Sequence, residues 1–159
     1  MNGSQSSRSR PRFRGFTLTE LLIALAIVAI LTSVAFPLYN NYTTRSHRAQ
    51  LMSDLGTCAQ ALERLYTVNF SYLAAAVDPA DLPTPPVANL CPQQSPQQNP
   101  RYNIVLSAVT ANDFVLRGIP IADGAQAGDG IVELRANGQR FWYRDDDEAT
   151  TAPQEGWDE

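Results

Sequence analysis

This chain of 159 residues has no lysine, one histidine and two cysteines, and these absences exclude several classes of function. A lone histidine and the lack of a C-x-x-C pair leave no ligand set for a metal or thioredoxin-type centre. The G-x-S-x-G, Walker and H-E-x-x-H motifs are also missing. We therefore predict that the protein is not an enzyme, and that it has no catalytic residue, no metal, no cofactor and no small-molecule substrate.

The longest apolar run spans residues 16–36 and contains a single ionisable side chain, Glu20. Its 21 residues are enough to cross the hydrocarbon core of a bilayer as a helix. Four arginines and no acid precede the run, which places the N-terminus in the cytoplasm by the positive-inside rule. A secretory signal would instead have its cleavage site after the apolar run. The sequence thus predicts one membrane-spanning segment, with the C-terminal domain that follows it in the periplasm or outside the cell.

The run Arg-Gly-Phe-Thr-Leu-Thr-Glu-Leu at residues 14–21, followed by the apolar stretch, resembles the processing motif of type IV pilins and type II secretion pseudopilins. The resemblance implies that a prepilin peptidase cuts between Gly15 and Phe16 and methylates the new amine of Phe16. It also implies that Glu20 acts in assembly and that Pro37 bends the long helix. The protein would then lie in the bacterial inner membrane before it joins other pilin subunits in an extracellular pilus.

Glu20 also stands out on physical grounds alone. A carboxylate inside a membrane helix costs about 2.5–3.5 kcal/mol at the centre of the bilayer and less near its surface. One hypothesis pairs Glu20 with the α-amine of Phe16 on a neighbouring subunit, which would set the axial register of a filament. The alternative is a simple membrane anchor, in which the Glu20 side chain extends to the lipid headgroups.

Beyond Pro37 the helical pattern resumes, and we predict one helix from Phe16 to Val68, kinked at the proline. Apolar residues at helical spacing predict one buried face for its second half. The residues of this face are Tyr42, Ala49, Met52, Leu55, Ala59, Leu62 and Tyr66. The charged residues expected on the opposite, exposed side are Arg45, Arg48, Asp54, Glu63 and Arg64.

Residues 74–100 hold seven of the eleven prolines and end in a stretch rich in glutamine and asparagine. This composition excludes regular helix and central strand, and it predicts a long surface loop. Cys58 lies on the predicted helix and Cys91 in this loop. Two cysteines in an exported chain predict a disulfide, and the alternative is a pair of buried thiols.

Four runs rich in Val, Ile, Leu, Phe and Tyr follow, at residues 102–108, 113–121, 130–136 and 139–144. The last two flank Asn137-Gly138, a strong signal for a two-residue hairpin. We therefore predict an α+β, type IV pilin-like fold, in which one long N-terminal helix packs on a four-stranded antiparallel sheet within residues 101–144. Residues 145–159 carry seven acids without the spacing of a calcium loop, so a solvated acidic tail is expected.

These elements divide the chain into a leader (1–15) that is removed, an apolar half-helix (16–37) and a head (38–159). Counted after residue 48, the head has six arginines against fifteen acids. We therefore predict that the head binds no nucleic acid unless Arg135, Arg140 and Arg144 share one face.

The departure of the two cysteines from the C-terminal pair of many pilins favours a minor pilin of a type IV pilus, with a role in twitching motility or adhesion. The Asn69-Phe70-Ser71-Tyr72 segment, which resembles a motif of minor pilins, points the same way. One alternative is a pseudopilin of a type II secretion system. A second is an uncleaved, membrane-anchored periplasmic binding domain.

Cleavage of the leader distinguishes the two pilin hypotheses from the hypothesis of an uncleaved, membrane-anchored domain. The N-terminal peptide isolated from native membranes is expected to begin at Phe16 and to carry one added methyl group, which mass spectrometry will detect. A peptide that retains the arginines of the leader would contradict processing.

Overall fold

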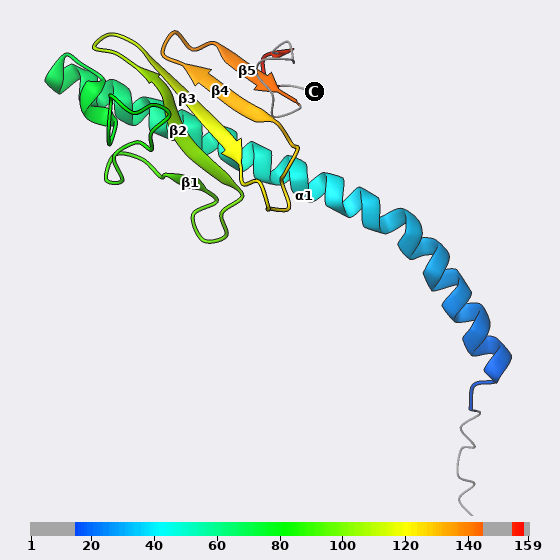
Figure 1. Ribbon diagram of the computed structural model, residues 1–159. Coiled ribbons are helices and arrows are strands. Elements are labelled where there is room, and N and C mark those ends of the chain that lie inside the picture. The colour runs from blue at the N-terminus through cyan, green and yellow to red at the C-terminus, as the bar shows by residue number, and fades with distance from the viewer. Residues whose placement is uncertain (1–14, 145–153, 158–159) are drawn as a thin grey trace, which may run out of the picture. The chain divides into compact units, whose positions relative to one another are not determined.

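The computed structural model describes residues 15–144 and 154–157 (Figure 1). Its elements in chain order are α1 (Leu18–Asn69), the 3-10 turn η1 (Leu73–Ala75), β1 (Gln94–Ser95), β2 (Tyr102–Val109), β3 (Phe114–Pro120), β4 (Ile131–Arg135), β5 (Arg140–Tyr143) and β6 (Gln154–Glu155). The chain forms two compact units, residues 1–40 and 41–159, and each is described by itself. Nearly all of the predicted leader and most of the predicted acidic tail lie outside the described residues.

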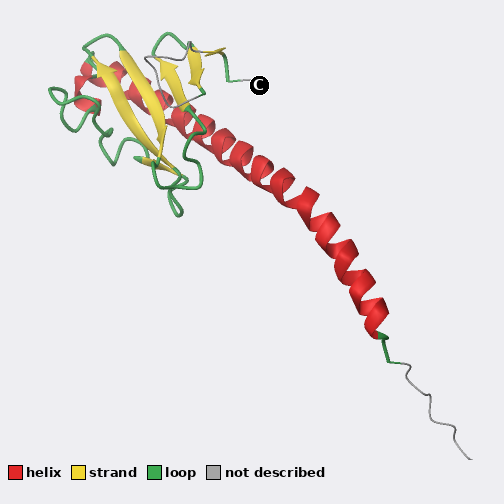
Figure 2. Ribbon diagram, turned by 45° about the vertical axis from the view of Figure 1, so that its right-hand side comes forward, coloured by secondary structure: helices red, strands yellow, loops and turns green. Residues whose placement is uncertain are grey.

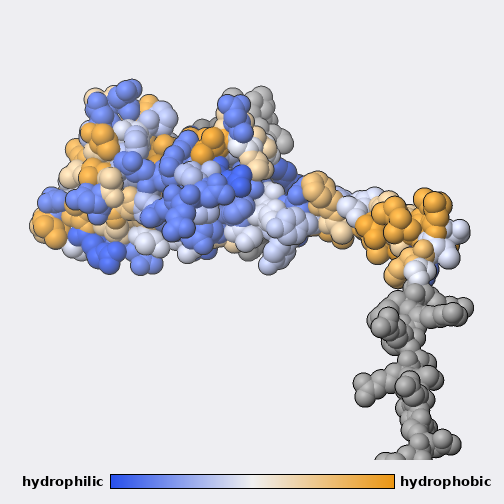
Figure 3. All heavy atoms as spheres, turned by 90° about the horizontal axis from the view of Figure 1, so that it is seen from below, coloured by the Kyte–Doolittle hydropathy of each residue, from blue (hydrophilic) through white to orange (hydrophobic). Residues whose placement is uncertain are grey.

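The first unit contains the apolar beginning of α1. Thr17 caps the helix, because its Oγ1 accepts a hydrogen bond of 3.2 Å from the backbone N–H of Glu20. Every large apolar side chain from Leu18 to Tyr39 is at least 53% exposed (Figure 3). By length and composition this stretch can cross a membrane. Its exposed surface is matched to lipid or to apolar partners rather than to water.

The second half of α1 buries one face, but not quite the predicted one. Leu51, Leu55, Cys58 and Leu62 are fully buried and follow a spacing of four, three and four residues. Leu55 and Leu62 belong to the predicted stripe, whereas Tyr42 and Ala49 are exposed. The predicted stripe was wrong at these two positions, and elsewhere it included the half-buried Met52 and Ala59 instead of their fully buried neighbours Leu51 and Cys58.

The second unit is built on an antiparallel sheet in the order β1-β2-β3-β4-β5-β6. Its strands are yellow in Figure 2. Strands β2 to β5 confirm the four predicted strands to within two residues at each end. The outermost strands β1 and β6 are only two residues long each, and the sequence did not predict them. The predicted fold, a long helix packed on an antiparallel sheet, is confirmed.

One face of the sheet packs on α1 and forms the core. Alternate residues on β2 point inward, so that Tyr102, Ile104 and Leu106 are fully buried. The helix packs tightly against Gly118 of β3, where an added Cβ would lie 2.5 Å from the Leu51 side chain. Glycine at this position therefore sets how near the helix can lie to the sheet.

The proline-rich segment runs along the β2 edge of the sheet. Thr84 forms an isolated bridge with Leu106, and the segment then ends in β1, which pairs with β2. The predicted disulfide is confirmed, since Cys58 and Cys91 are bonded with their Cα atoms 5.0 Å apart. A closed loop of this length contributes roughly 3–4 kcal/mol in the chain-entropy account. The bond fixes the segment to α1.

A buried ion pair joins α1 to the connection between β3 and β4. Arg48 is 7% exposed, and its Nε and Nη2 donate to the two carboxylate oxygens of Asp129 at 3.0 and 2.5 Å. The phenol of Tyr102 also donates to Asp129, and burial raises the pKa of Tyr102 so that it remains a donor. Trp142 Nε1 donates to the Asp129 carbonyl at 2.9 Å, and the Arg48 guanidinium lies 3.7 Å from the centre of the Trp142 ring.

Arg48 was predicted on the exposed side of the helix, and that prediction was wrong. An arginine can be buried where a carboxylate and an aromatic face replace water around the guanidinium. Gly130 allows this arrangement, because its φ of +101° suits glycine and an added Cβ would lie 2.4 Å from the carbonyl oxygen of Tyr143.

Replacing Arg48 by methionine is expected to lower the free energy of unfolding by about 3–5 kcal/mol, because Asp129 would remain buried without its cation. Urea unfolding of the protein in detergent, followed by tryptophan fluorescence, measures the change. Arg64→Met, at an exposed position of the same helix, is the control and should change stability by less than about 0.5 kcal/mol. Equal effects of the two substitutions would contradict the role of the ion pair.

Candidate functional site

The residues predicted to act in processing and assembly lie at the start of the first unit. Phe16 is 83% exposed and precedes the helix cap. Glu20 is exposed in the first helical turn, where a carboxylate also interacts favourably with the helix dipole. An added Cβ on Gly15 would contact nothing within 4 Å, so packing gives no reason for glycine there. Pro37 lies inside α1, which continues through it, and its predicted kink stays a prediction.

The face of the sheet opposite α1 is the second candidate site. We call it the outer face and define it by the outward positions of β1 to β4. These residues are Gln94, Asn103, Val105, Ser107, Val115, Arg117, Ile119, Ile131, Glu133 and Arg135. The register places Val105, Arg117 and Glu133 in one row across three strands.

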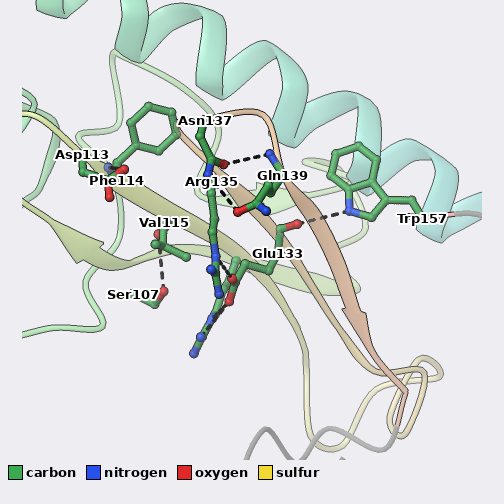
Figure 4. Close-up of polar contacts among 10 residues, drawn as sticks. Ser107, Asp113, Phe114, Val115, Glu133, Arg135, Asn137, Gln139 and Trp157 are labelled. Atoms are coloured by element: carbon green, nitrogen blue, oxygen red, sulfur yellow. Dashed lines mark hydrogen bonds and ion pairs between the residues drawn. The ribbon is translucent and has the colours of Figure 1, made fainter. Parts of the chain in front are cut away.

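Two arginines share one carboxylate in the middle of this face. Arg117 donates to Glu133 Oε2 from Nε at 2.8 Å, with its Nη2 2.7 Å from the same oxygen. Arg135 Nε donates to Glu133 Oε1 at 2.6 Å, a pairing that Figure 4 shows along β4. The Glu133 side chain is fully buried, whereas 18% of Arg117 and 40% of Arg135 is exposed. The hydrogen bond to Glu133 raises the pKa of Arg135 above its ordinary value.

An open groove of about 610 Å³ lies at the β1–β2 end of the outer face. Its polar lining consists of the amide side chains of Gln93, Gln94, Gln97 and Asn103. Gln94 Nε2 donates to Asn103 Oδ1 at 3.2 Å, and Gln93 Nε2 donates to the Pro86 carbonyl at 2.8 Å. Pro92 and the glutamines form one wall of the groove. Because the preceding Cys91 is disulfide-bonded to α1, the start of this wall is held in place against the helix.

Acidic residues are distributed unevenly around these features. Residues 82–112, which include β1 and β2, contain no aspartate or glutamate. Strands β2 to β5 together contain one acid, the buried Glu133. A second hollow of about 580 Å³ is different, because Glu63 and Asp113 line it together with Arg135. Among the described residues, none that lines the groove is an acid.

The three arginines singled out from the sequence do not share a face. Arg135 pairs with Val115 on the outer face, whereas Arg140 pairs with Leu134, a core residue. The Arg140 guanidinium lies 4.7 Å from the Trp157 ring centre, and that of Arg144 lies 4.8 Å from the Trp142 ring centre. The residues that do share a face, above all Arg117 and Asn103, were missed. Strand alternation applied to β2 and β3 would have found them.

No group of three or more His, Cys, Asp or Glu side chains converges on a point that could hold a metal within residues 15–144 and 154–157. The acid run at residues 145–148 lies outside the described part of the chain.

Comparison with known proteins identifies the family. Residues 37–130 match the family described as type IV minor pilin ComP, DNA uptake sequence receptor, which covers more than half of the chain. The chain belongs to this family of type IV minor pilins. Residues 10–36 match the prokaryotic N-terminal methylation motif. The protein is thus a structural, non-enzymatic pilin subunit, as the sequence predicted.

Several individual pilins are similar to this ComP-family chain. Fimbrial protein EcpC of Eikenella corrodens is 28% identical over 133 residues, which are 80% of this chain and 78% of EcpC. Type IV major fimbrial protein FimA of Dichelobacter nodosus is 46% identical over 50 residues, 31% of this chain and 32% of FimA. Among solved structures, the minor pilin PilV of Neisseria meningitidis matches this chain with a TM-score of 0.47 and 19% sequence identity. The match covers 74% of this chain and 93% of the PilV chain.

The family overturns one prediction. The head was expected to bind no nucleic acid, but its residues match a family described as a DNA uptake sequence receptor. The expectation was wrong because it summed charge over the whole head. Most of the acids that dominate this sum lie in α1, in loops and in the C-terminal 15 residues, and not on the outward positions of the strands.

Proposed function

We propose that this minor pilin binds DNA with the outer face of its head and carries that head on a type IV pilus. The observation that supports the proposal best is the charge pattern of this face. Among the described residues that define the face, the only acid is Glu133, which is buried between two arginines, and the polar part of the lining of the adjoining groove consists of amides. The family match includes β2, β3 and the groove.

The side chains on this face suit the two kinds of contact that DNA requires. Arginine guanidinium groups form paired hydrogen bonds with phosphate oxygens, and these contacts position the duplex. Glutamine and asparagine amides both donate and accept, so they can pair with base edges such as that of adenine. Arg117 and Arg135 would hold the backbone while Gln94 and Asn103 meet bases.

The N-terminal unit would deliver the head to the filament. We propose that residues 1–15 are a cytoplasmic leader, cut after Gly15, and that Phe16 is then methylated. Residues 16–37 would span the inner membrane and later pack in the filament core, with residues 38–159 in the periplasm and then outside the cell. The exposed apolar side chains of this stretch and its methylation motif support the proposal.

Glu20 is proposed to pair with the amine of Phe16 on a neighbouring subunit. Replacing it by glutamine keeps the length and the polarity of the side chain but removes the charge. We expect Glu20→Gln to insert into the membrane normally and to be absent from sheared pili, as measured by immunoblotting of both fractions. The matched control is Thr17→Ser, which preserves the cap. Normal incorporation of Glu20→Gln would contradict the pairing.

The DNA proposal predicts a loss of affinity from changes on the outer face. The double variant Arg117→Gln, Arg135→Gln is expected to weaken binding of duplex DNA at least tenfold, and to lower the slope of log affinity against log salt by about 2. Fluorescence anisotropy with a labelled duplex at several salt concentrations measures both. Arg64→Gln removes one exposed arginine from α1 and should have little effect. Unchanged affinity of the double variant would contradict this interface.

A further inference from the structure

We propose that Glu133 is the positioning residue of the DNA-binding face. In this role it fixes the orientation of Arg117 and Arg135 toward phosphate rather than merely balancing their charge. The inference rests on the proposed function. It concerns strand β4, which lies beyond the part of the chain that matches the family.

Each carboxylate oxygen of Glu133 contacts a different arginine. Oε2 accepts from Arg117 Nε at 2.8 Å and lies 2.7 Å from Arg117 Nη2, while Oε1 accepts from Arg135 Nε at 2.6 Å. A buried carboxylate is costly unless it is paired and hydrogen-bonded, and here both oxygens are satisfied by guanidinium groups. The charge-assisted bonds at Nε restrict rotation of each guanidinium about its side chain.

Aromatic residues of β5 complete the restraint. The Arg135 guanidinium lies 4.5 Å from the centre of the Phe141 ring, and that of Arg117 lies 5.9 Å from the centre of the Tyr143 ring. Phe141 is also the register partner of Glu133. Arg135 is thus held by a carboxylate and by a ring while 40% of its side chain remains exposed. A guanidinium restrained in this way loses less conformational entropy when it binds phosphate.

Two roles for Glu133 predict opposite results when its charge is removed. If it only balances charge, Glu133→Gln makes the face more positive by one unit and should tighten binding to DNA. If it positions the arginines, the same variant should weaken binding, because a neutral amide cannot hold both guanidinium groups. We expect Glu133→Gln to weaken binding about tenfold at constant salt.

The experiment measures anisotropy of a labelled duplex with the processed, full-length protein in detergent, at three salt concentrations. Asp123→Asn, at an exposed loop position, makes the same change in net charge and is the matched control. We expect Asp123→Asn to bind as tightly as the unmodified protein or slightly tighter. Binding of Glu133→Gln equal to or tighter than that of Asp123→Asn would overturn the proposal.

A second variant covers the case in which Glu133→Gln does not fold, which tryptophan fluorescence will show. Arg135→Lys keeps the positive charge but lacks the planar group that Glu133 orients. We expect Arg135→Lys to lose as much affinity as Arg135→Gln, and retention of affinity would overturn the positioning role. If the double arginine variant still binds normally, the proposed interface fails and the positioning role with it. If the double variant binds DNA more weakly but Glu133→Gln and Arg135→Lys bind it normally, the interface is supported and the positioning role of Glu133 is refuted.

Discussion

The packing of α1 on one face of the sheet is the constraint on which the rest of the head depends. Leu51, Leu55 and Leu62 fill this contact, and Gly118 lets the helix come close. Because side chains alternate along a strand, burying one set of positions commits the intervening set to the other face. The outer face, with its arginines and amides, is therefore a direct consequence of the hydrophobic core.

For DNA binding, the charge at the outer face of this pilin matters more than the net charge of the whole chain. The chain is acidic as a whole, with a formal net charge of −4. DNA responds to the field within about a Debye length, roughly 8–10 Å in physiological salt, so acids farther than this from the outer face are largely screened. Glu63 and Asp113 are not that remote, because they line one hollow with Arg135. What matters locally is that Glu133 is enclosed by Arg117 and Arg135 and that no exposed acid lies in residues 82–112.

The fold was predictable from the sequence to a large extent because its signals are local. Helical spacing predicted α1, and Asn137-Gly138 predicted the hairpin between β4 and β5. Its loop has three residues, 136–138, and not two, because Arg135 N–H donates to the Gln139 carbonyl and only Gly138 has a positive φ there. The two-residue strands β1 and β6 have no local pattern to detect. Arg48 was wrongly predicted to be exposed, and Glu133 was not singled out, for a different reason. A charged residue is expected at the surface unless its partners are known. Asp129 lies 81 residues from Arg48, and Glu133 needs Arg117, 16 residues away, as well as the nearby Arg135.

The most direct test of the DNA-binding face is a map of the residues that respond to DNA. Amide and side-chain NMR spectra of the labelled protein in detergent, recorded while duplex DNA is added, provide this map. The proposed function predicts saturable changes at the side-chain signals of Gln94, Asn103, Arg117 and Arg135, with the buried α1 face unaffected. Changes confined to the helix or to the hollow lined by Glu63 and Asp113 would contradict it.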